Sequence, residues 1–266
     1  MKKKVTLRDI AEEAGVSVAT VSYILNNRDD QCISEATRKK VLQIVNLYGY
    51  QINFRAKSIS SGKTNIVGLY LGHGSFALKR AEHFLLIRRL TKALKEKGLS
   101  LRVVDNTETS RLEWCDAVIC CDAEEGFFKT VSEANFCPVI ALDMFYDDQL
   151  FCQINSSYEK IKGIAHEIFG GEPYTVICHE QRNEGLCNEL NATFERIVYV
   201  SSFEEINAVR DKNLVVLGEM LGQYCKSIRK NVLSIDIASY EKINKLIECL
   251  EVTISRSGDV PHDIRV

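Results

Sequence analysis

The chain has 266 residues, of which 45% are hydrophobic and 26% charged, as in folded proteins with one large domain or a small and a medium one. Lys2, Lys3 and Lys4 precede VTLRDIAEEAG, where a secretory signal would have an apolar stretch, and the longest apolar runs are only strand-length. We therefore expect a cytoplasmic protein with no membrane partner.

The net charge of −2 hides a difference between the two parts of the chain. Residues 1–63 carry 11 Lys/Arg and 6 Asp/Glu, a formal charge of +5, whereas the remainder carries 23 and 30, a formal charge of −7. A basic segment joined to an acidic one predicts a polyanionic partner for the first segment only.

Ten cysteines raise the question of disulfides or a metal site. No two of them form a C-x-x-C pair, and Cys120, Cys121 and Cys178 lie in apolar runs typical of buried strands. Free cysteine in such a place behaves as a small hydrophobic residue. We therefore expect reduced, structural thiols and neither a metal nor a cofactor.

The spacing of apolar residues over 1–49 predicts three short helices. Thr6 and Asp9 have the capping-box spacing, Gly15 interrupts the first helix, Ser17 can cap the second, and Ser34 the third. Helix, tight glycine-containing turn and helix is the helix-turn-helix arrangement, with the third helix closing a small core.

The second of these helices lies in AGVSVATVSYILNN, residues 14–27. Helical spacing turns Val21, Ile24 and Leu25 inward. The outward face is then Ala19, Ser22, Tyr23 and Asn26, with Val18 at its edge. A helix that enters the DNA major groove needs small side chains for close approach and polar groups for base edges and phosphates. The alternative, a helical bundle with a solvated face, would normally show Glu and Lys there, so nucleic acid is favoured.

VTLRDIAEEAGVSVATVSYILNN and ISEATRKKVLQIVNLYGYQIN resemble the DNA-binding head of the lac repressor/galactose repressor (LacI/GalR) family over residues 5–64. The resemblance implies base contacts from Val18, Ala19 and Tyr23, and phosphate contacts from Thr6, Ser17, Thr20, Ser22 and Asn26. Tyr23 stands where many members have Arg, which would pair with guanine, so the preferred operator need not be the common one.

Residues 50–64, YQINFRAKSISSGKT, resemble the family's hinge, a helix that enters the minor groove when two subunits bind. The matching residues are Asn53, Arg55, Ala56 and Lys57, and Ile59 replaces the Leu that wedges between base pairs. Such a wedge kinks DNA and favours a deformable base step. Ile52 replaces the usual Pro, and an ordinary linker remains the alternative.

From residue 65 to 266 apolar runs of strand length alternate with helical patterns, which predicts parallel sheets covered by helices. The predicted strands are 66–71, 99–104, 116–121, 138–142, 151–154, 175–178, 196–200, 213–218 and 232–237. The clearest helices are Leu78–Lys97, Tyr158–Phe169 and Tyr240–Leu250. The resemblance implies an all-α helix-turn-helix head (1–49), a hinge (50–64) and an α/β two-lobed body (65–266) resembling type I periplasmic binding proteins.

The body is shorter than the family pattern. About ten residues join the second and third predicted strands, too few for a crossover helix, which takes a dozen or more. The chain also runs from strand 213–218 to strand 232–237 without an intervening strand. Gly218 and Glu219 stand where the family places an Asp that holds a sugar or purine.

Arg182 is the plausible match to the family's effector-binding arginine, although a surface cation on a helix remains the plainer interpretation. Asp143 and His73 follow predicted strands and could contact a ligand or simply belong to polar loops. No nucleophile, base and orienting group come together, so we expect no enzyme. The favoured function is a homodimeric repressor that binds a palindromic DNA operator. The alternative is a sensor whose body binds a sugar, phosphosugar or purine and so controls DNA affinity.

Overall fold

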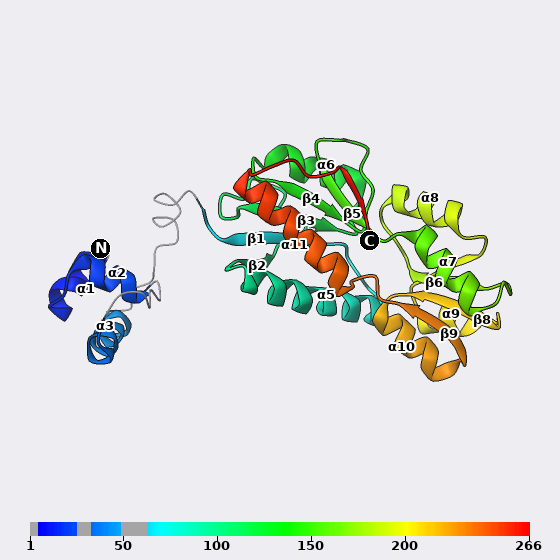
Figure 1. The fold of residues 1–266 in the computed structure, drawn as a ribbon, viewed down its shortest axis with the longest axis horizontal. Coiled ribbons are helices and arrows are strands. Elements are labelled where there is room, and N and C mark those ends of the chain that lie inside the picture. The colour runs from blue at the N-terminus through cyan, green and yellow to red at the C-terminus, as the bar shows by residue number, and fades with distance from the viewer. Residues whose placement is uncertain (1–4, 26–32, 49–62) are drawn as a thin grey trace. The chain divides into compact units, whose positions relative to one another are not determined.

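The computed structural model describes residues 5–25, 33–48 and 63–266 (Figure 1). The chain divides into two compact units, residues 1–62, here called the head, and residues 63–266, here called the body. Among the described helices, none combines the length and the apolar character needed to cross a bilayer.

The described part of the head holds three helices, α1 (Leu7–Ala14), α2 (Val18–Leu25) and α3 (Glu35–Leu47). The predicted capping box at Thr6 and Asp9 is confirmed, because each side chain accepts the other residue's backbone N–H. Gly15 ends α1 with a φ of 69°, a left-handed conformation that glycine adopts without strain. The three helices enclose a small core: Ile10, Ala11, Ala14, Val21, Ile24 and Val41.

The first lobe of the body is built on a six-stranded parallel sheet in the order β10-β5-β4-β3-β1-β2. Its strands are β1 (Ile66–Leu71), β2 (Ser100–Val103), β3 (Ala117–Cys121), β4 (Val139–Leu142), β5 (Cys152–Asn155) and β10 (Asp263–Arg265). One face packs on α5 (Ala77–Glu96) and α11 (Tyr240–Ser255), and the other on α6 (Glu125–Ala134).

The second lobe has a four-stranded parallel sheet in the order β7-β6-β8-β9. Its strands are β6 (Thr175–His179), β7 (Ile197–Val200), β8 (Asn213–Leu217) and β9 (Asn231–Ile235). One face packs on α7 (Tyr158–Ile168) and α8 (Glu184–Thr193), and the other on α9 (Phe203–Ala208) and α10 (Glu219–Ile228). The chain passes between the lobes after β5 and again after β9 (Figure 1).

The predicted fold class is confirmed: a helical head precedes two parallel sheets that helices cover on both faces. Each of the nine predicted strands overlaps an observed strand, whereas β10 was not predicted. Three residues with Asp and Arg at their ends carry too short an apolar signal, and only pairing with β5 makes this segment a strand.

The structure has the two short connections that the sequence predicts. Residues 104–116 join β2 to β3 without a helix, and Leu112 and Trp114 from this loop cover the sheet beside Gly68. In the second lobe only α10 separates β8 from β9, and these two strands pair directly. The second lobe therefore closes on a short sheet whose last strand leads straight back to the first lobe.

Candidate functional site

The N-terminus of α2 is held by a side-chain cap. Ser17 Oγ accepts the backbone N–H of Thr20 at 3.0 Å, and the two side-chain hydroxyls lie 2.8 Å apart. The cap fixes two hydroxyl groups beside the first turn of α2, where backbone N–H groups also favour an anion. This local geometry suits a phosphate oxygen.

The orientation of α2 follows the predicted spacing. Val21 and Ile24 are fully buried, and Leu25 packs against the same core. On the opposite side Val18 is 43% exposed, and Ala19 and Ser17 are exposed as well. Thr20, Ser22 and Tyr23 are half-buried, so they border the exposed face rather than stand out from it.

The other predicted DNA contacts divide into two groups. Thr6 lies at the start of α1, where its hydroxyl donates to Asp9 at 2.7 Å. The remaining contacts lie outside the described residues: Asn26, Asn53, Arg55, Ala56, Lys57 and Ile59. For all these residues the contact with DNA stays a prediction.

A pocket of about 420 Å³ lies between the two lobes of the body. Its walls come from segments that follow the carboxyl ends of β1, β6 and β7, where parallel sheets usually bind ligands. The polar groups at its wall include Ser75, Gln181, Tyr199 and Ser201. Convergent hydroxyl, amide and cationic groups suit a small, hydroxylated ligand.

Arg182 and His73, both predicted effector contacts, line this pocket and a second one of about 240 Å³. The Arg182 guanidinium donates to the His73 carbonyl oxygen at 2.9 Å and lies 3.7 Å from the Glu124 carboxylate. His73 Nδ1 lies 2.9 Å from the amide nitrogen of Asn106. Arg182 belongs to the second lobe and His73 to the first, so their contact bridges the cleft.

Asp143, the third predicted effector contact, lines neither of these two pockets. It pairs instead with the Lys242 ammonium at 2.5 Å, and both side chains are largely buried. Burial raises the pKa of the Asp143 carboxyl, and the Lys242 ammonium opposes that shift. The structure therefore gives Asp143 an internal partner from α11.

The sequence did not reveal a second buried ion pair at the cleft, between Lys79 and Asp122. Lys79 also donates to the carbonyl oxygen of Glu180 across the cleft. Asp122 directly follows β3, the usual place for a ligand-binding residue, and this was the available signal. Lys79 carried no such signal, because a lysine near the start of a helix normally faces solvent.

His179 ends β6 inside the body and is only 4% exposed. Neither ring nitrogen has a hydrogen-bond partner within the described part of the chain. Burial lowers the pKa of His179 to about 3, and the nearby charges of Lys79 and His83 act in the same direction. The folded protein therefore keeps this imidazole neutral at any ordinary pH.

His179 should make the body less stable in mild acid. Because its pKa is about 3 when folded and 6.5 when unfolded, only the unfolded chain gains this proton as the pH falls below 6.5. The free energy of unfolding should therefore fall by about 2 kcal/mol more between about pH 6.5 and pH 5 in the wild type than in His179→Leu. Urea unfolding at several pH values measures this. Equal pH dependence, or the same change in the exposed control His166→Gln, would contradict it.

The described residues offer little for a metal ion. No three His, Cys, Asp or Glu side chains gather within the described part of the chain in a way that could hold one. Cys120, Cys121 and Cys178 are buried in β3 and β6, where burial raises their thiol pKa values. Their place in the strands fits the structural role that the sequence predicts.

Comparison with known proteins covers both units. Residues 6–53 match the family model described as bacterial regulatory proteins, lacI family. The probable transcriptional repressor ExuR of Bacillus subtilis is 27% identical over 203 residues, 70% of this chain and 60% of that protein. The regulator RegA of Clostridium saccharobutylicum is 42% identical over 66 residues, 25% of this chain and 19% of that protein.

The lac repressor dimer bound to operator and an anti-inducer aligns with a TM-score of 0.62 at 16% identity, covering 99% of this chain and 96% of that chain. At this identity the likeness shows the fold alone. The chain spans 60% of the length of ExuR. The family match of the head, the relatives that extend into the body and the shared fold agree. The head at residues 6–53 therefore matches the lacI family of bacterial regulatory proteins, and the chain as a whole is similar in fold to a lac repressor.

Proposed function

We propose that this chain is a sequence-specific DNA-binding transcription regulator of the cytoplasm that acts as a homodimeric repressor. One observation carries the proposal: α2 exposes Val18 and Ala19 beside a hydroxyl-lined cap, on a helix whose other side is locked into the core. A small, uncharged face on a rigid helix fits the floor of the major groove.

Each exposed group has a distinct role in this proposal. Val18 and Ala19 contact base edges and thymine methyl groups, whereas the Ser17 and Thr20 hydroxyls bind phosphate oxygens. Tyr23 offers a hydroxyl at the border of the same face. The minor-groove contacts proposed for residues 50–64 rest on their sequence alone.

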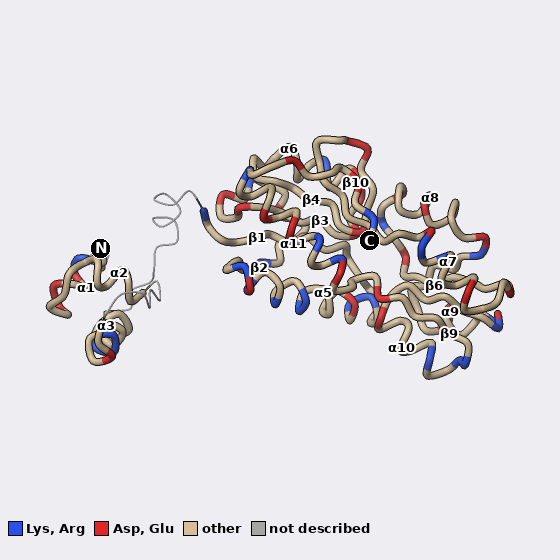
Figure 2. The backbone as a smooth tube through the Cα atoms, viewed as in Figure 1, with Lys and Arg blue, Asp and Glu red and all other residues tan. Residues whose placement is uncertain are grey.

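The body is proposed to join two chains. The edge strand β2 packs beside α5, and the two elements expose Val103 and Phe84, which are 50% and 62% accessible. Lys/Arg and Asp/Glu residues are interspersed over the body, with no long run of one sign along the chain (Figure 2). A mixed surface of this kind does not compete with the head for DNA, so the body can serve as the dimerising unit.

The decisive experiment is selection of DNA from random duplexes at about 0.15 M salt with competitor DNA present. We expect a palindrome whose half-sites are separated by a deformable central step. Recovery of single half-sites would contradict the homodimer, and recovery of no sequence would contradict sequence-specific binding altogether. The molar mass of the free protein, measured by light scattering, tests the dimer independently.

The interlobe pocket supports a second candidate function, a sensor that binds a sugar, phosphosugar or purine and thereby controls DNA affinity. Arg182 and the hydroxyl groups of Ser75 and Ser201 give the pocket a chemistry suited to such ligands. A ligand present at 100 times its dissociation constant should add about 2.7 kcal/mol to the free energy of unfolding. Absence of a thermal shift across these three classes would contradict the sensor function.

A further inference from the structure

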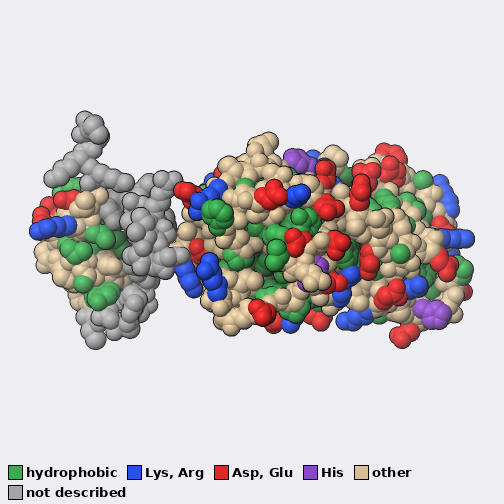
Figure 3. Space-filling view, turned by 90° about the horizontal axis from the view of Figure 1, so that it is seen from above, with side chains coloured by type: hydrophobic (Ala, Val, Ile, Leu, Met, Phe, Trp, Pro, Cys, Tyr) green, Lys and Arg blue, Asp and Glu red, His purple; other side chains and the backbone are tan. Residues whose placement is uncertain are grey.

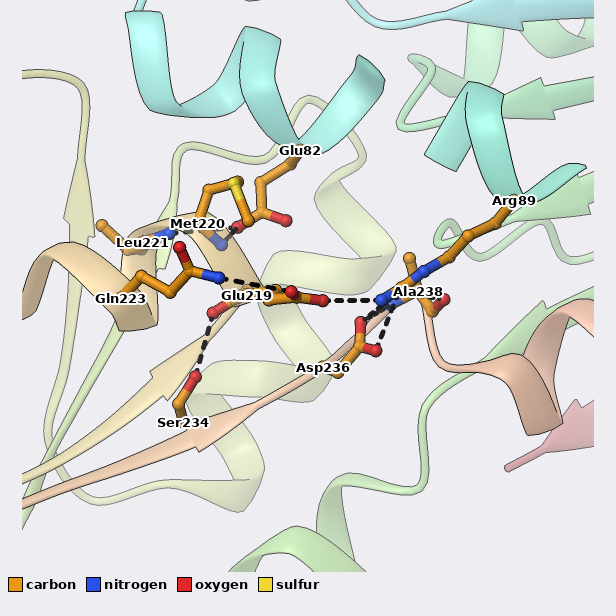
Figure 4. Close-up of polar contacts among 10 residues, drawn as sticks. Glu82, Arg89, Glu219, Met220, Leu221, Gln223, Ser234, Asp236 and Ala238 are labelled. Atoms are coloured by element: carbon orange, nitrogen blue, oxygen red, sulfur yellow. Dashed lines mark hydrogen bonds and ion pairs between the residues drawn. The ribbon is translucent and has the colours of Figure 1, made fainter. Parts of the chain in front are cut away.

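Helix α5 of the first lobe also contacts the second lobe. Its middle and end pack on the sheet of the first lobe, while its beginning packs against α10 of the second lobe (Figure 1). Two side chains of α5, Glu82 in its first half and Arg89 past its middle, make polar contacts with the second lobe or with the segment that joins the lobes (Figure 4).

Glu82 is 8% exposed and lies against the N-terminus of α10. One carboxylate oxygen accepts the backbone N–H of Met220 at 2.6 Å and that of Leu221 at 3.1 Å (Figure 4). The first N–H groups of a helix have no partner within the helix and carry a partial positive charge, so they bind carboxylates well. A side chain of the first lobe thus caps a helix of the second.

Gly218 leaves the space that Glu82 needs. A Cβ atom at this position would lie 2.6 Å from the carboxylate oxygen of Glu82, which is closer than such atoms approach. Its φ of 133° is also a conformation that side-chain-bearing residues rarely adopt. The absence of a side chain at Gly218 therefore allows the Glu82 carboxylate to reach the start of α10.

Arg89 makes the second connection. Its guanidinium donates to both oxygens of Asp236 at 2.8 Å, to the Ala238 carbonyl at 2.7 Å and to Glu219 at 2.6 Å (Figure 4). Glu219 begins α10, and Asp236 and Ala238 lie in the segment between β9 and α11. The side chain of Arg89 is 10% exposed. These charge-assisted hydrogen bonds connect α5 to the start of α10 and to the segment between β9 and α11.

We propose that Glu82 and Arg89 form a latch that holds the two lobes together without a bound ligand, with the Glu82 carboxylate as the internal ligand of an anion site at the start of α10. The observed arrangement of the two lobes is then a property of the chain itself. A small molecule in the interlobe pocket adds to this state rather than creating it. The latch concerns the body alone and does not depend on DNA binding.

The anion site is tested by chemical rescue in the full-length protein. In ligand-free wild type the amides of Met220 and Leu221 should be protected from hydrogen exchange. In Glu82→Ala they should exchange at least about tenfold faster, while amides of β3 do not change. Sodium formate should slow them again in this variant, whereas sodium chloride at equal ionic strength and formate on wild type should have no effect.

Two further variants keep the test decisive. Glu82→Gln retains the shape of the side chain and should show a smaller increase in exchange, which gives a readout if Glu82→Ala does not fold. Lys97→Ala removes the exposed ion pair between Lys97, which directly follows α5, and Glu251 inside the first lobe, and it should change nothing. Unchanged exchange in both Glu82 variants, or no effect of formate on Glu82→Ala, would overturn the anion site.

Calorimetry tests the latch. The wild-type body should unfold in one transition because its lobes are coupled, and the double variant Glu82→Ala/Arg89→Met should unfold in two. A single body transition in the double variant would overturn the latch, because the lobes would then be held together by other contacts.

Discussion

Replacing Ala19 with glutamate is expected to abolish most operator binding without destabilising the head. Ala19 is exposed on α2, so the longer side chain meets no core residue, but on DNA its carboxylate would face base edges and phosphates. A lost base contact is worth about 1–3 kcal/mol per half-site, hence about 2–6 kcal/mol for a dimer, or about 30-fold to 20,000-fold in affinity. Fluorescence anisotropy with the selected operator measures the loss.

The matched control places the same negative charge elsewhere on the head. Gln43 is exposed on α3, so Gln43→Glu changes the net charge equally without altering the exposed face of α2. Its affinity should fall only by the general electrostatic term, well under tenfold at about 0.15 M salt. If Gln43→Glu lost as much affinity as Ala19→Glu, or if Ala19→Glu bound like wild type, α2 would not be the recognition helix.

The head was predictable from its sequence because its signals are local. The capping residues Thr6, Ser17 and Ser34 each accept a hydrogen bond from the backbone N–H three residues later. A cap can therefore be predicted from the local sequence alone. The helical spacing of Val21 and Ile24 likewise predicts the buried side of α2. The strands of the body were predictable for a similar reason, since continuous apolar runs mark strands buried on both faces.

The cleft was predictable only in part, because its contacts join distant parts of the chain. His73 was found because it follows a predicted strand, and Arg182 because it matches the arginine that the family resemblance implies. The structure places both at the pocket wall. Glu82 and Arg89 were missed because charged residues on a long helix normally face solvent. Their burial depends on α10 and on the interlobe segment, more than 120 residues later in the sequence.

The surface of the body gives no comparable signal of its own. On the face drawn in Figure 3, small groups of hydrophobic side chains lie among charged side chains of both signs. Single exposed hydrophobic residues are common on soluble proteins and need no special explanation. Apart from the dimer contact proposed at Val103 and Phe84, the functional conclusions therefore rest on the head and on the cleft rather than on the exterior of the body.

Removing one partner of the buried pair Lys242–Asp143 is expected to destabilise the body by about 3–5 kcal/mol. The Lys242 side chain is 2% exposed, and Lys242→Met keeps its length while leaving the Asp143 carboxylate buried without its cation. Because burial already raises the pKa of Asp143, loss of Lys242 should raise it further, and part of the lost stability should return as the pH falls. Urea unfolding followed by circular dichroism measures both effects.

The double variant Lys242→Met/Asp143→Asn measures the coupling between Lys242 and Asp143 apart from the other contacts of each residue. Asparagine suits position 143, where φ is 49°, because it adopts the left-handed conformation more readily than most residues. With no charge left unpaired, the double variant should be more stable than Lys242→Met alone by at least about 1 kcal/mol. Additive losses would show that the two groups act independently, and Asp143 would then be free to serve a ligand. A strong coupling places it in the framework that fixes α11 against the first sheet, close to where the chain returns from the second lobe.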